Sequence, residues 1–481
     1  MFGGYGLENP YLEIDKKIIS EIYTSSEPLD NLTILCDVYG SRFAGSPGDR
    51  ASVEWMVTKL REYGIENAHY ETYEMPGWIR GDANLEVISP IERQMECISL
   101  PFGIGGTVEG DLVDLGDGAV DVYEKRKSEI DGNIVMVSSR NPIGLNRHLH
   151  RREKYIRSIL AGAKGWIFVN QYPAYGPQTG GVSPIIPAIS ISYEDGCFLS
   201  RLIEREKTVK VRITTTDKNI EITSFNVVCD IPGTSDSKEY VLSGSHYDGH
   251  DISQGALDPA SGAVTVIEMA RVLNMVKDKI KRRIRLVCFG AEEVGLHGSY
   301  NYVKQHSSEM DDLRFMLNLD SAARSGKKGI ILHDHPELEP FMDKIAKEMK
   351  ADLPYFQRVS PYSDHWPFFL KGVPCGSGGD PEEIRTSTGR GYGHTKFDTV
   401  DKVELSHLRE AAANYARFLV RVANIDVWPA RRKTQQEIEE FVKKQGYDET
   451  VALEARVKNY VRSWKIIPPE TEAWLERKSD W

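Results

Sequence analysis

Regular alternation of strand-like and helix-like segments over residues 219–425 is the feature that most constrains this chain. Short apolar runs such as YVLSGSH alternate with longer segments such as SGAVTVIEMARVLNMV, whose apolar residues recur every three or four positions. The first pattern is typical of buried strands and the second of amphipathic helices. Their alternation favours a mostly parallel central sheet flanked by helices. We therefore expect an α/β fold whose functional groups lie at the carboxyl ends of the strands.

Three further parts surround this region. Residues 1–105 begin with helical patterns and are expected to form the N-terminal part of the same domain. Residues 106–218 are rich in glycine and contain shorter strand and helix patterns, which predict a compact α+β module. Residues 426–481 are charged and predict a helical C-terminal extension. The extension carries an apolar stripe at helical spacing, which we expect to pack on the body of the protein or on a second subunit.

Composition excludes several classes of protein. The chain has 60 basic and 71 acidic side chains, a net charge of −11, which argues against a general nucleic-acid binder. No apolar run approaches the roughly 20 residues of a membrane span, so no membrane partner is expected. The first residues show no signal-peptide pattern, and a cytoplasmic location is the expectation unless a signal was trimmed. Six cysteines without CxxC spacing are expected to be reduced thiols.

Metal-competent side chains gather at or just after the predicted strand ends. Taken singly, each has an ordinary structural interpretation, such as a strand-end residue or a turn cap. Their joint occurrence at consecutive strand ends of one α/β region is hard to explain without a metal site. The residues are His246, Asp248, Asp258, Glu292, Glu293, Asp320 and His394.

The chemistry of this set indicates which metal it would bind. Imidazole and carboxylate ligands without thiolate suit zinc, with cobalt or manganese as alternatives. Two histidines and three carboxylates exceed a single catalytic zinc site, which uses three protein ligands and a water. They suit two metals about 3.5–4 Å apart that share a carboxylate. One carboxylate would then bridge, another would stay unligated as general base, and each metal would need its own histidine.

A family resemblance runs through the same residues. It is carried by the blocks SGSHYD, GALDPASGAV, CFGAEEVGLHGS, NLDS, SDHWPF and GHTKFDTVD. In order and spacing they resemble the co-catalytic dizinc exopeptidases, the family that includes bacterial leucyl aminopeptidase and glutamate carboxypeptidase. The N-terminal stretch is similar to the carboxypeptidase Q-like subgroup, and residues 106–218 resemble a protease-associated domain. The resemblance implies a zinc exopeptidase fold with this domain inserted.

Roles for the metal-competent residues follow from the resemblance, position by position. It implies two Zn²⁺ per chain, with Co²⁺ or Mn²⁺ possible. His246 and Asp320 would ligate one zinc, and Glu293 and His394 the other. Asp258 would bridge both ions.

The resemblance also implies the roles of two carboxylates that are not ligands. Glu292 would be the general base, and a metal-bridging hydroxide would attack the peptide carbonyl. Asp248 would accept a hydrogen bond from the far imidazole nitrogen of His246, because residues two apart on a strand face the same side. The sequence departs from the family where Pro259 follows Asp258. The family bond there is often cis, and proline lowers the cost of a cis bond, so we predict a cis Asp258–Pro259 bond.

Substrate selection is less well defined by the sequence. Beside a metal site, an arginine can hold a substrate carboxylate with two hydrogen bonds, whereas an exposed arginine in a polar loop is the ordinary alternative. The segment SDHWPF either lines the pocket or caps a helix, and His250 and Asp251 either touch the site or are polar loop residues. The candidate substrate-binding residues are Asp364, His365, Arg385, Arg390 and Tyr392.

The leading hypothesis is a dizinc metallo-exopeptidase of the aminopeptidase or dipeptidase type, acting on short peptides. Two alternatives stay open. The first is a carboxypeptidase or amidohydrolase acting on N-acyl amino acids or other small amides. The second is a non-catalytic binding protein with a protease-associated domain, which the full set of ligands and Glu292 disfavours. We also expect a homo-oligomer, a dimer or higher, from the apolar stripe of the tail and from the tendency of the subgroup to dimerise.

Overall fold

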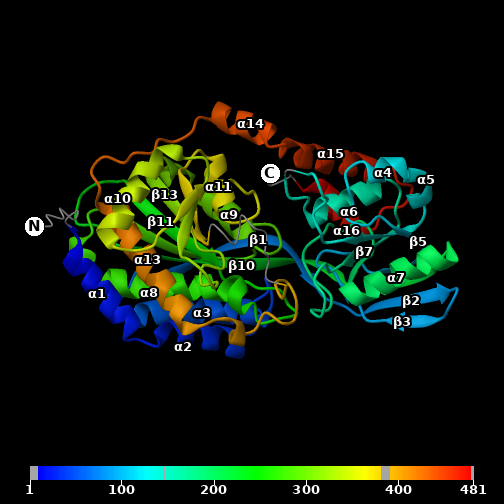
Figure 1. The fold of residues 1–481 in the computed structure, drawn as a ribbon, viewed down its shortest axis with the longest axis horizontal. Helices are drawn as coiled ribbons and strands as arrows, with labels where there is room; N and C mark the ends of the chain where they lie inside the picture. Colours follow the sequence, from blue (N-terminus) through cyan, green and yellow to red (C-terminus); the bar gives the residue numbers. More distant parts are fainter. Residues whose placement is uncertain (1–8, 146, 381–390, 478–481) are drawn as a thin grey trace, which may run out of the picture. The chain divides into compact units, whose positions relative to one another are not determined.

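A computed structural model describes residues 9–145, 147–380 and 391–477 of the chain. Its contacts divide the chain into two compact units (Figure 1). The first unit comprises Met1–Glu74, Thr223–Arg390 and Asp398–Glu439, and the second comprises Met75–Ile222, Gly391–Phe397 and Glu440–Trp481.

The first unit is built on a sheet with the strand order β1-β10-β12-β11-β13-β16-β14-β15 among the described residues. The central strands β12, β11, β13 and β16 run parallel to one another, whereas β10 and β14 pair antiparallel with β12 and β16. The sequence prediction of an α/β fold with a mostly parallel centre is confirmed. The strands are β1 (His69–Ile79), β10 (Lys218–Ile231), β11 (Tyr240–His246), β12 (Arg283–Phe289), β13 (Leu313–Asn318), β14 (Gly329–Leu332), β15 (Tyr355–Gln357) and β16 (Cys375–Gly379).

The register of the central strands brings their carboxyl ends to one edge of the sheet. His246 at the end of β11 pairs with Phe289 at the end of β12, and Gly244 pairs with Asn318 at the end of β13. The polar residues that follow these three strands therefore emerge at the same edge. Ligands of open α/β sheets bind at such edges.

Helices cover this sheet on both faces. Figure 1 shows α8 and α13 below the strands, and α9 and α11 above them. All residues of α8 except Arg271 and Asn274 are buried, as expected for a helix that packs against both β11 and α13. The helices are α1 (Leu12–Tyr23), α2 (Glu27–Thr33), α3 (Pro47–Glu62), α8 (Ser261–Asn274), α9 (His297–Gln305), α10 (Glu339–Met349), α11 (His365–Leu370) and α13 (Leu405–Asn424).

Helix α3 illustrates how local sequence sets the bounds of an element. The Ser46 side chain accepts a hydrogen bond from the amide of Asp49, and Pro47 occupies the first helical turn. Serine caps and early prolines favour helix starts. Gly64 follows the helix with a φ of +78°, a conformation that favours glycine. This helix agrees with the helical patterns expected within residues 1–105.

The second unit holds another sheet, with the strand order β3-β2-β9-β5-β6-β7-β8-β4 among the described residues. Strands β5 to β8 are parallel neighbours. Residues 83–99, which the sequence analysis placed in the N-terminal part of the first domain, pair here, β2 with β9 and β4 with β8. The elements are β2 (Ala83–Ser89), β3 (Arg93–Met95), β4 (Ile98–Ser99), β5 (Gly106–Asp114), α4 (Val122–Lys125), α5 (Lys127–Ile130), β6 (Ile134–Ser138), α6 (Arg151–Leu160), β7 (Gly165–Val169), β8 (Ala188–Ile191), α7 (Tyr193–Glu206) and β9 (Lys210–Thr215).

The C-terminal extension forms α14 (Gln435–Lys444), α15 (Asp448–Arg462) and α16 (Pro469–Glu476). Leu453, Val457 and Val461 of α15 are buried in the same hydrophobic core as Trp166 of β7. The predicted apolar stripe therefore packs on the body of the protein, within the second unit. Because the stripe is buried within this unit, it does not support the expected homo-oligomer, which stays a prediction.

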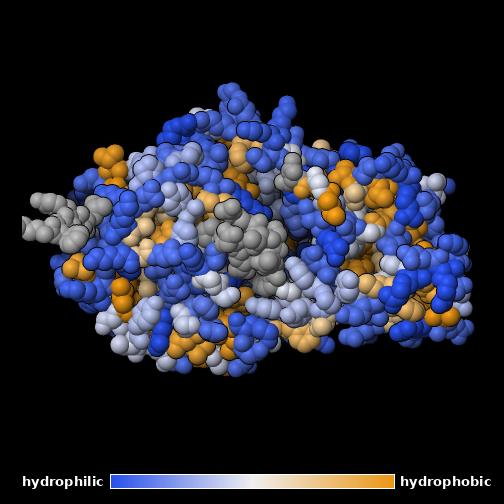
Figure 2. Space-filling model, viewed as in Figure 1, coloured by the Kyte–Doolittle hydropathy of each residue, from blue (hydrophilic) through white to orange (hydrophobic). Residues whose placement is uncertain are grey.

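The cysteines, the helices and the surface each show one general property of the chain. The six cysteines are free thiols. None of the described helices is long and apolar enough to cross a membrane. Figure 2 shows a face on which hydrophilic residues predominate and apolar residues form small scattered groups.

Candidate metal centre

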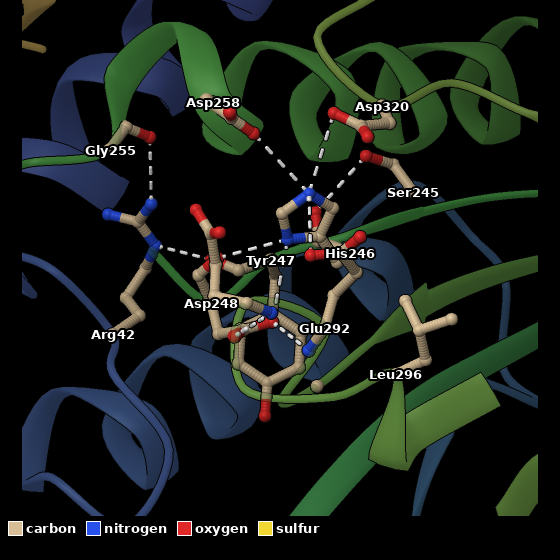
Figure 3. A network of polar contacts seen from close by, with 12 residues as sticks. Arg42, Ser245, His246, Tyr247, Asp248, Gly255, Asp258, Glu292, Leu296 and Asp320 are labelled. Atoms are coloured by element: carbon tan, nitrogen blue, oxygen red, sulfur yellow. Dashed lines mark hydrogen bonds and ion pairs between the residues drawn. The ribbon is translucent and has the colours of Figure 1, made fainter. Parts of the chain in front are cut away.

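Three of the predicted ligands converge at the carboxyl end of β11. The Nε2 atom of His246 lies 3.5 Å from Oδ1 of Asp258 and 3.5 Å from Oδ1 of Asp320 (Figure 3). Each of the three offers a ligand atom within 4.8 Å of the other two. One imidazole and two carboxylates at this separation match the donor set of a zinc site. The general base expected from the sequence is adjacent, with Glu292 Oε2 at 3.9 Å from His246 Nε2.

Glu293 has a different partner. Its Oε2 atom lies 3.0 Å from Nε2 of His250, and both side chains are almost fully buried. The sequence left open whether His250 touches the site, and the structure places it directly against a predicted ligand. Its position two residues beyond Asp248 was the only signal in the sequence. His394 lies in the segment Gly391–Phe397 of the second unit, and its role as a ligand stays a prediction.

Asp248 lies beside the far ring nitrogen of His246, as the resemblance implies, and also makes contacts that the sequence did not predict. Nδ1 of His246 lies 3.1 Å from the backbone carbonyl of Asp248 and 3.5 Å from its carboxylate. The carboxylate also accepts hydrogen bonds from the backbone amides of Glu292, at 3.0 Å, and Glu293, at 3.3 Å. Asp248 thus fixes the backbone of the base and of a predicted ligand.

A hydrogen-bonded serine orients Asp320. Ser363 Oγ donates to Asp320 Oδ2 at 2.9 Å, and Asn318 Nδ2 donates to Ser363 Oγ at 2.6 Å. Partners of this kind orient metal ligands. The sequence pointed to the segment SDHWPF, and Asp364 and His365 were the expected site residues within it. The contact shows that Ser363 supports the site through Asp320.

The two candidates within SDHWPF have different environments. Asp364 precedes α11 without capping it by a side-chain hydrogen bond, and burial raises the pKa of its carboxyl to about 7. The His365 ring stacks on that of His333 at 3.8 Å, and its Nε2 lies 2.7 Å from the carbonyl of Ser360. Burial lowers the pKa of His365 to about 4, so this imidazole is neutral near pH 7.

The remaining substrate-binding candidates lie outside the described part of the first unit. Arg385 and Arg390 lie outside the described residues. Tyr392 belongs to the second unit, where its ring lies 6.3 Å from that of Tyr175. The carbonyl of His394, in the same segment as Tyr392, accepts a hydrogen bond from the amide of Thr179 at 2.8 Å. Their roles toward a substrate stay predictions.

The loop that leads to Asp258 adopts the predicted backbone. The Asp258–Pro259 bond is cis, as expected from the proline. The amides of Leu257 and Asp258 donate to the carboxylate of Asp398, at 2.8 and 3.0 Å. Sequence reasoning missed Asp398, although it lies inside the block GHTKFDTVD that carries part of the resemblance.

Buried charge makes the site suited to a divalent cation. Burial alone would lower the pKa of His246, but Glu292, Asp248 and Asp320 together raise it well above its usual value. Burial raises the pKa of Glu292 well above the usual range, and nearby carboxylates add to this rise. Carboxylates packed this closely repel one another. A bound cation would stabilise their ionised forms, so the residues present fit zinc.

Comparison with known proteins agrees with this chemistry. The family model of peptidase family M28 matches residues 226–419, and the PA domain model matches residues 108–197. Carboxypeptidase Q of Mus musculus is 30% identical over 328 residues, 65% of this chain and 69% of the relative. Aminopeptidase YwaD of Bacillus subtilis (strain 168) is 26% identical over 404 residues, 81% of this chain and 83% of the relative.

A solved structure gives the same fold. The crystal structure of a peptidase M28 precursor from Shewanella amazonensis SB2B matches with a TM-score of 0.77 at 23% identity, covering 88% of this chain and 98% of that one. Fold, site and relatives together define a zinc-dependent exopeptidase, an enzyme of the hydrolase class. The chain belongs to peptidase family M28 and carries an inserted PA domain.

Proposed function

We propose that the protein is a dizinc exopeptidase that hydrolyses dipeptides or short peptides, in the manner of an aminopeptidase or dipeptidase. The observation that carries the proposal is the convergence of His246, Asp258 and Asp320 beside Glu292. The names of the relatives, carboxypeptidase Q and aminopeptidase, support action on peptide ends.

Two zinc ions account for the whole set of metal-competent groups. His246 and Asp320 would hold the first ion, Glu293 and His394 would hold the second, and Asp258 would supply a ligand to both. Cobalt or manganese would suit the same ligands. When bound, the metals supply Lewis acidity that activates water and polarises the scissile carbonyl.

Glu292 moves the proton in the proposed mechanism. Its side chain lies beside the His246 cluster, and its backbone amide is fixed by Asp248. Burial raises its pKa well above the usual range, which brings a carboxylate closer to the affinity for protons that a general base requires near neutral pH. Glu292 takes a proton from the attacking water and delivers it to the leaving amine.

A Glu292→Gln substitution tests this role. We expect kcat to fall by about 10²- to 10⁴-fold, the usual contribution of a general base. Zinc content should stay unchanged, because Glu292 is not a ligand in this proposal. A matched control is Glu404→Gln. The Glu404 side chain is 75% exposed, and it has no proposed part in metal binding or catalysis. Full activity of Glu292→Gln on every substrate would exclude the mechanism.

The second candidate is a carboxypeptidase or an amidohydrolase acting on N-acyl amino acids. It is supported by the relatives named carboxypeptidase Q, which this chain resembles as well as those named aminopeptidase. Hydrolysis rates on dipeptides, aminoacyl-nitroanilides and N-acyl amino acids separate the two. Preference for a free α-amine supports the aminopeptidase or dipeptidase, and cleavage of substrates with a blocked amine supports the second candidate.

A further inference from the structure

The loop between His246 and Asp258 is spanned by one buried arginine. Arg42 is fully buried. Its Nε donates to the carbonyl of Tyr247 at 2.7 Å, its Nη1 to that of Gln254 at 2.8 Å, and its Nη2 to that of Gly255 at 3.1 Å. Figure 3 shows the guanidinium lying between Gly255 and the start of the loop.

These contacts fix both ends of the loop with a single planar group. Tyr247 directly follows His246, and Gly255 precedes Asp258 by three residues. Nη1 of Arg42 also donates to the carbonyls of Leu35 and Gly40, which joins the loop to the N-terminal segment. A guanidinium offers five donors in a rigid fork. A lysine ammonium has three donors on one nitrogen, so it cannot reach the same carbonyls together.

A buried carboxylate acts on the same loop from its amide side. Asp398 is 1% exposed, and it accepts hydrogen bonds from the amides of Leu257 and Asp258. Gln254 adds a further tie, because its Oε1 accepts from the amide of Val400 at 2.9 Å. Hydrogen bonds to ionised groups are stronger than neutral ones. The loop is therefore held by a buried cation on its carbonyls and a buried anion on its amides.

We propose that Arg42 and Asp398 are positioning residues that hold His246 and Asp258 at metal-binding separation. Neither residue needs to touch metal or substrate, since both act through the backbone of residues 247–258. Burying a guanidinium among carbonyls has a desolvation cost that its hydrogen bonds must offset. The proposal rests on the dizinc site of the proposed function. It also explains how an irregular loop can hold two metal ligands in a fixed geometry.

Zinc affinity of the full chain tests the proposal without reference to catalysis. Dissociation constants are measured by chelator competition for the wild type, Arg42→Lys and Asp398→Asn. We expect zinc to bind about 10- to 100-fold more weakly in both variants, the usual effect of losing a group that orients a metal ligand. Absorption spectra of the cobalt-loaded proteins should show altered ligand geometry. Asp398→Asn keeps the shape of the side chain, so it still tests the proposal if Arg42→Lys does not fold.

A second buried arginine provides the matched control. Arg421 on α13 is 2% exposed and donates to Asp15 at 3.0 and 2.8 Å, and none of its hydrogen bonds reaches the loop. Arg421→Met should lower the unfolding temperature and leave the zinc affinity of the folded protein unchanged. Equal weakening by Arg421→Met would overturn the proposal, because general destabilisation would then explain the effect.

The remaining outcomes are also decisive. Wild-type zinc affinity in folded Arg42→Lys and Asp398→Asn would overturn the positioning role, even if the wild type hydrolyses peptides. A wild type that binds zinc tightly, loses it in both variants and cleaves no peptide would support the positioning role and refute the proposed function. Failure of the wild type to bind zinc would overturn both.

Discussion

At the scale of single residues, the site is organised by side chains that hold backbone groups. Asp248 accepts from the amides of Glu292 and Glu293, and Asp398 accepts from the amide of Asp258. Such contacts place a ligand by fixing its main chain, so its own side chain remains available for a metal. Outer partners of this kind tune both geometry and affinity.

Asp49 allows a pH-dependent prediction at the same scale. It accepts hydrogen bonds from Tyr247 Oη at 2.5 Å and from the amide of Gly45 at 2.8 Å. Burial raises the pKa of its carboxyl to about 7, whereas an unfolded aspartate titrates near 3.9. The folded state therefore binds a proton that the unfolded state releases between these two values. The contribution of Asp49 to stability is full below pH ~4, falls as the pH rises to ~7 and is constant above.

Urea unfolding of the wild type and Asp49→Asn between pH 4.5 and 8 measures this contribution. The asparagine side chain does not titrate. As the pH rises to ~7, the unfolding free energy of the wild type should therefore fall relative to that of Asp49→Asn. The slope should be at most about 1.4 kcal/mol per pH unit. Parallel pH profiles for the two proteins would show that Asp49 is ionised in the fold.

At the scale of secondary-structure elements, α15 is an integral part of the second unit. Leu453 is 1% exposed within the core that contains Trp166 and Tyr155, whereas Val451, on the same helix, is 42% exposed. Arg147 and Arg157 on the body also contact Glu449 of α15. The helix thus joins this unit mainly through buried apolar surface, because ion pairs with an exposed partner add little.

A pair of substitutions on α15 tests that view. Leu453→Ala should lower the free energy of unfolding by about 2–5 kcal/mol, since it leaves a cavity in the core. Val451→Ala should change it by less than about 0.5 kcal/mol, as for other surface positions. Denaturant unfolding followed by tryptophan fluorescence gives both values. Equal effects of the two substitutions would mean that the apolar side chains of α15 do not pack in the core.

The elements also show how far the sequence could predict the structure. Helix α8 and strands β11 to β13 were predictable because their apolar periodicity is local. The convergence of His246, Asp258 and Asp320 was predictable because parallel strands end at one edge. The pairing of β2 with β9 was not, since strand partners are chosen by contacts distant in sequence. Arg42 was missed for the same reason, as its partners lie some two hundred residues away.

At the scale of the whole molecule, the chain combines an M28 peptidase unit with a second unit that contains the PA domain. The first unit contains the His246 cluster, Glu292 and Glu293, together with Arg42 and Asp398. The second unit contains His394 and the C-terminal helices α15 and α16. The number and position of the bound metals are the central claim of the proposed function.

Anomalous diffraction at the zinc absorption edge, from crystals of the zinc-loaded full chain, tests that claim most directly. We predict two peaks about 3.5–4 Å apart, one beside His246 and Asp320 and the other beside Glu293, with Asp258 contacting both. A single peak at this edge of the sheet, or peaks away from these carboxylates, would contradict the dizinc site.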